Sequence, residues 1–402
     1  MFERALAPLL RARADQFSAV LVTGPRQSGK TTLCRAVFHS HEYVSLEAPD
    51  VRSRVRDDPR GFLRGLRGGA ILDEVQHVPE LLSYLQGEID ERPERGRFVL
   101  TGSQNFTLSA TVSQSLAGRV GVAELLPLSV SELAAAGRLG DVWTCVLRGG
   151  YPAIHARRME PHDWFSSYVA TYVERDVRQL LNVVDLTAFE TFLALAAART
   201  SQLLDHSRIG SDVGITQPTA RRWLTVLEAS YLVFRLPPFF RNLGKRLVKT
   251  PKLHFFDSGL LCYLLGIRTV EQLRYHPLRG AIFESWVVSE IGKAYRNAGE
   301  RAGLTFFRDR HGLEVDLIAE FGLSRSIVEV KSAETVSFDA FASVDAVAAL
   351  LAGVDDGSST ERVLIYAGAE LVRHKGVSVL PWSEVGGHAW PGLAPLASAP
   401  KG

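Results

Sequence analysis

The chain has 402 residues, of which 46% are hydrophobic and 22% charged, a composition typical of a globular protein with two or three domains. This composition excludes wholesale disorder, and no apolar run approaches the ~20 residues needed to cross a bilayer. The net charge is +2, and only eight of the 46 basic residues are lysines, so the abundance of arginine by itself says little about nucleic-acid binding.

The three cysteines, Cys34, Cys145 and Cys262, are few, odd in number and far apart. They exclude a disulfide framework and a four-cysteine zinc site, and they favour a reducing compartment. The first residues, MFERALAPLLRAR, lack the apolar stretch and the cleavage site of a signal peptide. We therefore expect a cytoplasmic protein with no membrane partner.

Short apolar runs alternate with helical segments over about the first 130 residues. The runs at 19–24, 69–75 and 97–103 each end in polar or glycine residues, as buried strands do. Such strands joined by helices predict a parallel α/β sheet whose functional site lies at the carboxyl ends of the strands.

The segment GPRQSGKT at residues 24–31 follows the first strand and leads into a helix that begins TTLCRAVF. It matches the phosphate-binding loop pattern of Gly, four residues and Gly-Lys-Thr. Its glycines permit the tight turn that points N–H groups at phosphates, Lys30 can bridge the β- and γ-phosphates, and Thr31 can bind Mg²⁺. The alternative is a chance glycine-rich turn. The predicted nucleotide-binding residues of this segment are Gly24, Pro25, Arg26, Gln27, Ser28, Gly29, Lys30, Thr31 and Thr32.

Four apolar positions lead to Asp73 and Glu74 at the end of the second strand. Asp73 is placed to hold Mg²⁺ through water, and Glu74 to orient or deprotonate the attacking water. The third strand, FVLTGSQNF, ends in small polar residues from Thr101 to Asn105, among which Ser103 is a candidate contact to the γ-phosphate. Solvated polar turns after these two strands are the simpler alternative.

These motifs resemble those of AAA-type ATPases. The chain is more closely similar to a bacterial and archaeal group in which such an ATPase is fused to a C-terminal domain of unknown function. The matching stretches are GPRQSGKTTL, AILDEVQ, LTGSQNF, LAGRV with LLPLSVSE, GGYP, YVERDV, RNLGKRLVKTPKLHFFDSGL, FESWVVSEI, and EVDLIAE with VEVKS. The resemblance implies ATP hydrolysis in a homo-oligomer, with Arg119 as an arginine finger that reaches the γ-phosphate of a neighbouring subunit. A surface or structural role for Arg119 is the alternative.

Residues 203–238 predict two short helices separated by a tight turn near Gly214. Trp223, Leu224 and Leu227 would give the second helix a core-facing stripe. The pattern resembles the winged helix-turn-helix of DNA-binding proteins, whose second helix enters a groove. The residues that this helix would present are Gln217, Thr219, Arg221 and Arg222.

The stretch between Glu228 and Asp257 has six basic residues and no acidic one. Such a run suits a wing that contacts a phosphate backbone. The basic residues are Arg235, Arg241, Lys245, Arg246, Lys249 and Lys252, of which Arg241, Lys245, Arg246 and Lys249 are the predicted DNA contacts. The alternative is a protein-interaction or lid module whose basic surface faces solvent or nucleotide.

Residues 314–332 predict two strands, with Asp316 on the first and with Glu329 and Lys331 on one face of the second. Glu284 lies in a predicted helix upstream. This arrangement resembles the PD-(D/E)xK nuclease fold, with Val315 in place of the proline. The resemblance implies that Asp316 and Glu329 bind Mg²⁺ or Mn²⁺, that Lys331 polarises the phosphate or water, and that Glu284 completes the site. An inactive fold and a coincidental pattern are the alternatives.

The predicted fold class is α/β, with five parts along the chain. These are an AAA-like P-loop ATPase domain (1–135), a connector (136–165), a helical, winged-helix-like domain (166–275), a PD-(D/E)xK nuclease-like domain (276–385) and a flexible tail (386–402). We predict an ATP- and Mg²⁺-dependent ATPase, associated with DNA, that controls the two following domains. The alternatives are an ATP-driven switch with an inactive nuclease fold that binds protein partners, and a toxin-like or chaperone-like ATPase without a nucleic-acid role.

Overall fold

The computed structural model describes residues 2–103, 116–173, 185–239, 248–301, 303–353 and 357–393. The chain folds into two compact units. Unit 1 comprises the residues up to Pro127 together with Ala229–Tyr231 and Arg296–Gly299, and unit 2 comprises the remainder. The finer division into an ATPase domain, a connector and two further domains stays a prediction.

Unit 1 alternates helices with strands along the chain. The strands form a parallel sheet in the order β2-β3-β4-β1-β5, and the apolar runs that predict strands correspond to β1, β3 and β4. The elements are α1 (Ala7–Gln16), β1 (Ala19–Thr23), α2 (Lys30–Val37), β2 (Glu42–Ser45), α3 (Pro49–Asp57), α4 (Pro59–Gly65), β3 (Ala70–Asp73), the 3₁₀ turn η1 (Val75–His77), α5 (Leu81–Glu91), β4 (Phe98–Gly102) and β5 (Val120–Glu124).

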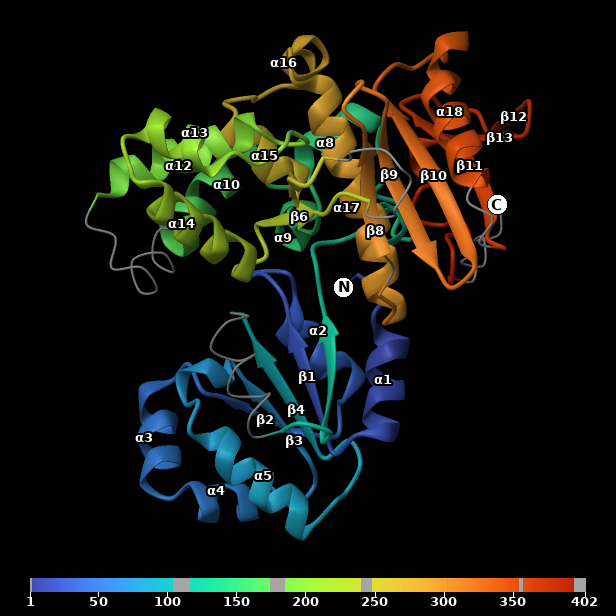
Figure 1. Ribbon diagram of the computed structural model, residues 1–402. Coiled ribbons are helices and arrows are strands. Elements are labelled where there is room, and N and C mark those ends of the chain that lie inside the picture. The colour runs from blue at the N-terminus through green and yellow to red at the C-terminus, as the bar shows by residue number, and fades with distance from the viewer. Residues whose placement is uncertain are drawn as a thin grey trace. The chain divides into compact units, whose positions relative to one another are not determined.

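Helices cover both faces of this parallel sheet (Figure 1), so its central strands are apolar on both sides. Leu21 and Leu100 pack on one face with residues of α3, α4 and α5. Val20 and Val99 pack on the other face with residues of α1 and α2. Because the strands are parallel, the carboxyl ends of β1, β3 and β4 meet at one edge of the sheet, as the sequence predicts.

Unit 2 begins with a helical region. Trp223, Leu224 and Leu227 of its helix α14 are buried, as predicted, whereas a winged-helix identity stays a prediction. The strands β6 and β7 pair antiparallel. The described elements are α7 (Val130–Ala135), α8 (Val142–Arg148), α9 (Pro152–Ala156), α10 (Pro161–Tyr168), the π-helical turn η2 (Val169–Val173), α12 (Leu186–Ala198), α13 (His206–Val213), α14 (Gln217–Ala229), β6 (Val233–Leu236), β7 (Lys252–Phe255), α15 (Ser258–Leu264) and α16 (Val270–Tyr275).

The rest of unit 2 is a mixed sheet between two helices (Figure 1), with the strand order β12-β13-β11-β10-β9-β8. Val287 of α17 clusters with Val328 of β10 on one face, and Val344 of α18 clusters with Ile327 on the other. The elements are α17 (Arg279–Ala298), β8 (Gly303–Arg308), β9 (Glu314–Phe321), β10 (Ser324–Lys331), η3 (Phe338–Phe341), α18 (Ala342–Ala352), β11 (Ser359–Tyr366), β12 (Val372–His374), β13 (Val377–Pro381) and η4 (Trp382–Glu384). No described helix is long and apolar enough to cross a membrane.

The segment that follows η4 corrects one expectation. The sequence predicts a flexible tail from residue 386, but Trp390 is only 1% exposed and belongs to the core of unit 2. Its indole Nε1 donates to the Val385 carbonyl oxygen at 2.9 Å, and Tyr295 OH donates to the Pro391 carbonyl oxygen at 2.8 Å. Burial of a tryptophan whose N–H has a hydrogen-bond partner is stabilising, so residues 386–393 pack against the core of unit 2. Residues 394–402 lie outside the described part of the chain.

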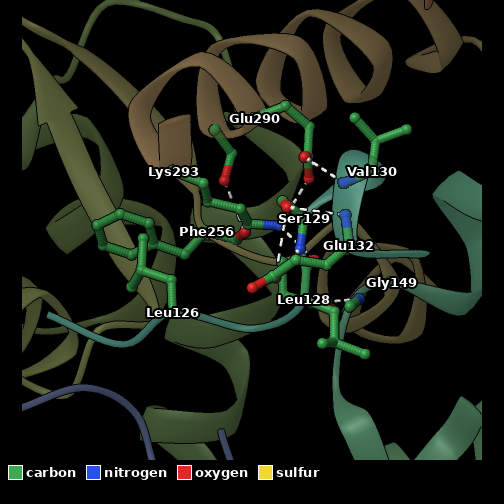
Figure 2. A network of polar contacts seen from close by, with 12 residues as sticks. Leu126, Leu128, Ser129, Val130, Glu132, Gly149, Phe256, Glu290 and Lys293 are labelled. Carbon is green, nitrogen blue, oxygen red and sulfur yellow. Dashed lines mark hydrogen bonds and ion pairs between the residues drawn. The ribbon is translucent and has the colours of Figure 1, made fainter. Parts of the chain in front are cut away.

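A buried ion pair holds the segment with which unit 2 begins (Figure 2). Lys293 Nζ lies 2.6 Å from Glu290 Oε1 and donates to the Leu128 carbonyl oxygen at 3.1 Å. The other oxygen of Glu290 accepts a hydrogen bond from the Val130 N–H at 2.7 Å. Both charged side chains are buried in α17. The stretches LLPLSVSE and FESWVVSEI, far apart in the sequence, therefore meet at this pair.

Candidate functional site

The predicted phosphate loop connects β1 to α2. Gly24 has φ +144°, and a Cβ at this position would lie 2.1 Å from the Leu125 carbonyl oxygen, so only glycine fits. Gly29 has φ +93°, and Gln27 has φ +63°, which is uncommon outside glycine. The loop backbone thus wraps tightly just before the N-terminus of α2, an arrangement that suits a bound phosphate. Of the other predicted loop residues, Pro25, Arg26 and Ser28 lie in the loop, and Thr32 lies in the first turn of α2.

Lys30 is buried, and its Nζ donates to the carbonyl oxygens of Gly24 at 3.1 Å and Pro25 at 2.9 Å. Burial lowers the pKa of Lys30, while the carboxylates of Glu74 and Asp73 oppose that fall. The ammonium group is therefore held inside the loop by neutral acceptors. A phosphate is a stronger, charged acceptor, so it could replace these carbonyl groups.

Three hydroxyl groups surround the carboxylate of Asp73 at the end of β3. Thr31 Oγ1 donates to Oδ1 at 2.9 Å and lies 3.0 Å from Oδ2. Tyr43 OH donates to Oδ2 at 2.8 Å, and Thr101 Oγ1 of β4 donates to Oδ1. Burial and the hydrogen bond to Asp73 raise the pKa of Tyr43 to about 12, so its hydroxyl keeps its proton. The structure brings together the predicted magnesium residues Thr31 and Asp73, whose oxygen atoms are of the kind that Mg²⁺ prefers.

Glu74 follows directly and is held in place by several groups. It has φ +59°, and its N–H donates to Thr101 Oγ1 at 3.1 Å. Its Oε2 accepts hydrogen bonds from Ser103 Oγ at 3.0 Å and from Gln76 Nε2. Burial raises the pKa of Glu74. The charge of Lys30 and the hydrogen bonds from Gln76 and Ser103 together lower it by more than burial raises it, so the pKa lies below its ordinary value. The carboxylate is therefore ionised, as a general base must be.

Sequence reasoning missed Tyr43 and Gln76. Tyr43 lies on the short strand β2, and no pattern in the sequence distinguishes it from other tyrosines. Gln76 belongs to the stretch AILDEVQ, which is a usable signal. Asn105, at the end of the predicted polar turn after β4, lies outside the described residues.

Arg119 lies at the end of the sheet opposite the phosphate loop. It precedes β5, which runs parallel to β1, and its carbonyl oxygen accepts a hydrogen bond from the N–H of Ala19 at 3.2 Å. Ala19 is the first residue of β1, and five strand residues span roughly 17 Å. The guanidinium pairs with Asp90 through Nε–Oδ1 at 2.6 Å and Nη2–Oδ2 at 2.9 Å. Arg119 is therefore not part of the nucleotide site of its own chain.

The predicted helix-turn-helix corresponds to α13 and α14. Gly214 ends α13 with φ +82°. Thr216 Oγ1 accepts a hydrogen bond from the Thr219 N–H at 3.3 Å and lies 2.9 Å from Thr219 Oγ1, so the Thr219 hydroxyl is engaged within its own helix turn. The predicted contacts of α14 that are exposed are Gln217, Arg221 and Arg222.

The predicted run of basic residues between Glu228 and Asp257 is not a continuous basic surface over the residues that the structure describes. Arg235 forms a two-point ion pair with Glu228. Lys252 is buried in β7 and faces carboxylates, so it cannot contact a phosphate backbone. Lys249 is exposed, as a contact residue must be. The three remaining predicted contacts, Arg241, Lys245 and Arg246, lie outside the described residues.

Lys252 lies instead in a cluster of carboxylates that contains the predicted nuclease-like residues. Its Nζ is 2.9 Å from Glu284 Oε1 of α17. The same atom is 2.7 Å from Glu314 Oε1 and 3.7 Å from Asp316 Oδ1, both of β9. The structure brings the predicted residues Glu284 and Asp316 together around Lys252, which the sequence analysis assigned to the basic run, and adds Glu314, which that analysis did not single out.

The other predicted members of this cluster lie on β10. Lys331 Nζ donates to Glu329 Oε1 at 2.5 Å, so the two side chains share a face, as predicted. Asp316 Oδ2 accepts a hydrogen bond from the Val330 N–H at 2.9 Å. Among the described residues, no group of three or more His, Cys, Asp or Glu is arranged to hold a metal ion. The metal-binding role predicted for Asp316 and Glu329 thus gains no support from the geometry.

Burial dominates the pKa values in the cluster. It raises the pKa of Glu284, Asp316 and Glu329, the last to about 7, although the lysines oppose these shifts. Burial lowers the pKa of Lys252, but the charges of Glu284, Asp316 and Glu314 outweigh it and raise that pKa above its ordinary value. Lys252 therefore stays positively charged.

Comparison with protein-family models divides the chain into three regions. Residues 16–134 match an AAA domain. Residues 139–271 match a domain of unknown function (DUF8612), and residues 279–385 match another (DUF4143).

Two mycobacterial proteins are similar to most of the chain. They are the uncharacterized protein Rv2008c of Mycobacterium tuberculosis and the uncharacterized protein Mb2031c of Mycobacterium bovis. Each is 33% identical over 339 residues, which is 83% of this chain and 75% of the relative. Among solved structures, the Walker-type ATPase PABY2304 of Pyrococcus abyssi is 16% identical, with a TM-score of 0.47 over 66% of this chain and 96% of that one.

Proposed function

The chain belongs to the same family as the mycobacterial protein Rv2008c and carries an AAA-type P-loop domain, and we propose that it hydrolyses ATP to regulate a DNA-binding module. The observation that carries the ATPase part is the convergence of Lys30, the Thr31–Asp73 pair and Glu74 at one edge of the parallel sheet of unit 1. These are the groups that phosphoryl transfer to water requires.

Each residue has a defined task in hydrolysis. Lys30 would bind the β- and γ-phosphates in place of its present carbonyl acceptors, and Thr31 and Asp73 would hold Mg²⁺, which when bound neutralises phosphate charge. Glu74 would accept a proton from water while the water oxygen bonds to the γ-phosphorus. The bond between that phosphorus and the bridging oxygen breaks, which gives ADP and inorganic phosphate.

Arg119 is proposed to act on a neighbouring subunit, since it lies far from the nucleotide site of its own chain. Its ion pair with Asp90 would have to open in a homo-oligomer, and the partial exposure of both side chains makes such an exchange inexpensive. The expected result is ATP turnover per chain that rises with protein concentration in the wild type and stays low in Arg119→Ala, with unchanged nucleotide binding. Concentration-independent turnover by a demonstrated monomer would contradict this role.

The DNA-binding part of the proposal rests on α14. Arg221 and Arg222 are exposed on the second helix of a helix-turn-helix, and Lys249 is exposed near the start of β7. The double variant Arg221→Ala/Arg222→Ala is expected to weaken binding to duplex DNA and to reduce the slope of log affinity against log salt by about 1 for each phosphate that the protein no longer neutralises. Fluorescence anisotropy across a salt series measures both effects.

A matched control for this experiment is Arg157→Ala/Arg158→Ala, which removes an adjacent exposed arginine pair elsewhere in unit 2. This control should bind DNA as the wild type does. Equal affinity and salt slope in all three proteins would show that α14 does not contact DNA.

The second candidate function is an ATP-driven switch that binds a protein partner and carries an inactive nuclease fold. The lysine-filled carboxylate cluster of unit 2 favours it. The two candidates differ in an electrophoretic shift assay with and without nucleotide, because the first requires a DNA complex and the second does not.

A further inference from the structure

The carboxylate cluster of unit 2 holds the ammonium group of Lys252 where three carboxylates converge, and Lys331 pairs with a fourth carboxylate, that of Glu329. Lys252 Nζ is within 2.9 Å of Glu284 and within 2.7 Å of Glu314, and it is 3.7 Å from Asp316. The side chain of Lys252 is 3% exposed, so water does not compete for these contacts. The lysine reaches the cluster from β7, whereas its partners lie on α17 and β9.

Most of the oxygens that a divalent cation would need are already engaged, the exception being Glu329 Oε2, which is buried without a hydrogen-bond partner among the described residues. Mg²⁺ binds oxygen ligands at 2.0–2.1 Å and demands near-octahedral geometry. Lys252 faces Asp316 Oδ1, the Val330 N–H donates to Asp316 Oδ2, and Lys331 donates to Glu329 Oε1. A metal ion between these groups would lie a few ångströms from two ammonium charges and would have to displace at least one of them.

Lys252 is fixed in this position by its backbone. It pairs with Leu236 in the β6–β7 ladder and forms an isolated bridge with Leu203. Its ammonium also lies 5.4 Å from the centre of the Phe306 ring, within the range of a cation–π contact. Withdrawal of the side chain would leave three partly buried carboxylates without this counter-charge, which is costly.

We propose that Lys252 is a permanent internal cation that replaces a divalent metal ion in this cluster, so that unit 2 neither binds a catalytic metal nor cleaves nucleic acid. The inference does not rest on the ATPase activity proposed for unit 1. Within the described part of the chain the carboxylates form no metal-binding group as they stand, and removal of the lysine should leave them free to rearrange around a divalent cation.

The test uses the thermal unfolding of the full chain without nucleotide, followed by tryptophan fluorescence. All six tryptophans lie in unit 2, so the signal reports this unit and not the P-loop domain. Millimolar MnCl₂ is compared with KCl of equal ionic strength. The wild type should show the same Tm in both salts. Lys252→Ala should have a lower Tm in KCl, and MnCl₂ should raise it by several degrees.

Two variants make the result specific. Lys252→Ala/Asp316→Asn should lose the response to MnCl₂, and Lys375→Ala, which removes an exposed lysine of unit 2, should never gain one. A rise in the Tm of the wild type that disappears in Asp316→Asn would overturn the proposal. So would a folded Lys252→Ala without any Mn²⁺ response, and so would Mn²⁺-dependent DNA cleavage by the wild type that is lost in Asp316→Asn. If Lys252→Ala fails to fold, the Tm of the wild type in MnCl₂ and the DNA cleavage assay on the wild type still test the proposal.

Discussion

Replacement of Glu74 by glutamine is expected to slow ATP hydrolysis by ~10²–10⁴-fold while ATP still binds, because the amide cannot accept the proton of the attacking water. The side chain keeps its size, so the hydrogen bonds that surround it can partly re-form with Ser103 and Gln76. Phosphate release measures turnover, and a fluorescent ATP analogue measures binding.

Glu91→Gln is the matched control, because it makes the same chemical change at an exposed position of α5. It should hydrolyse ATP at the wild-type rate. The pKa of Glu74 lies below its ordinary value, so the wild-type rate should not fall with pH until the solution is more acidic than a normal glutamate requires. Wild-type turnover in Glu74→Gln would remove Glu74 as the base.

Replacement of Lys293 by methionine is expected to lower the free energy of unfolding of unit 2 by about 3–5 kcal/mol, the cost of breaking a buried ion pair by removal of one partner. Glu290 would keep a buried carboxylate without its counter-charge, and the Leu128 carbonyl would lose its donor. Urea unfolding followed by tryptophan fluorescence measures the change in unit 2.

The pH dependence of this variant has a definite sign. Burial raises the pKa of Glu290, and Lys293 opposes that rise. Without Lys293 the folded-state pKa rises further above its unfolded value, so protonation relieves the buried charge and the destabilisation should shrink as the pH falls. Lys375→Met, at an exposed lysine, should change the unfolding free energy by less than about 0.5 kcal/mol. A loss below about 1 kcal/mol in Lys293→Met would show that the pair does not hold α7 to α17.

The nucleotide site could be predicted because its signal is local. The loop, its lysine and its threonine lie within eight residues between a buried strand and a helix, and Asp73 and Glu74 end a neighbouring strand. Parallel strands bring their carboxyl ends together whatever the connecting helices contain. Tyr43 could not be predicted, because its contact with Asp73 depends on the lateral position of β2 beside β3.

The role of Lys252 could not be predicted for a different reason. In the sequence it belongs to a run of basic residues, whereas its acidic partners Glu284 and Glu314 lie 32 and 62 positions downstream. Only the packing of β7 against α17 and the mixed sheet shows that its charge points inward. The predicted flexible tail is wrong around Trp390, because the Gly- and Pro-rich sequence there indicates mobility although burial of this one large side chain stabilises the segment.

The central claim, that unit 1 is a working ATPase, is tested most directly by Mg²⁺-dependent phosphate release from ATP by the full chain, with and without duplex DNA. We predict multiple turnovers in the wild type that stop when Mg²⁺ is chelated. We also predict no turnover in Lys30→Ala, because the described part of the loop offers no other lysine to bridge the phosphates. A folded wild-type protein that releases no phosphate under any of these conditions, or a Lys30→Ala variant that hydrolyses ATP equally well, would contradict the claim.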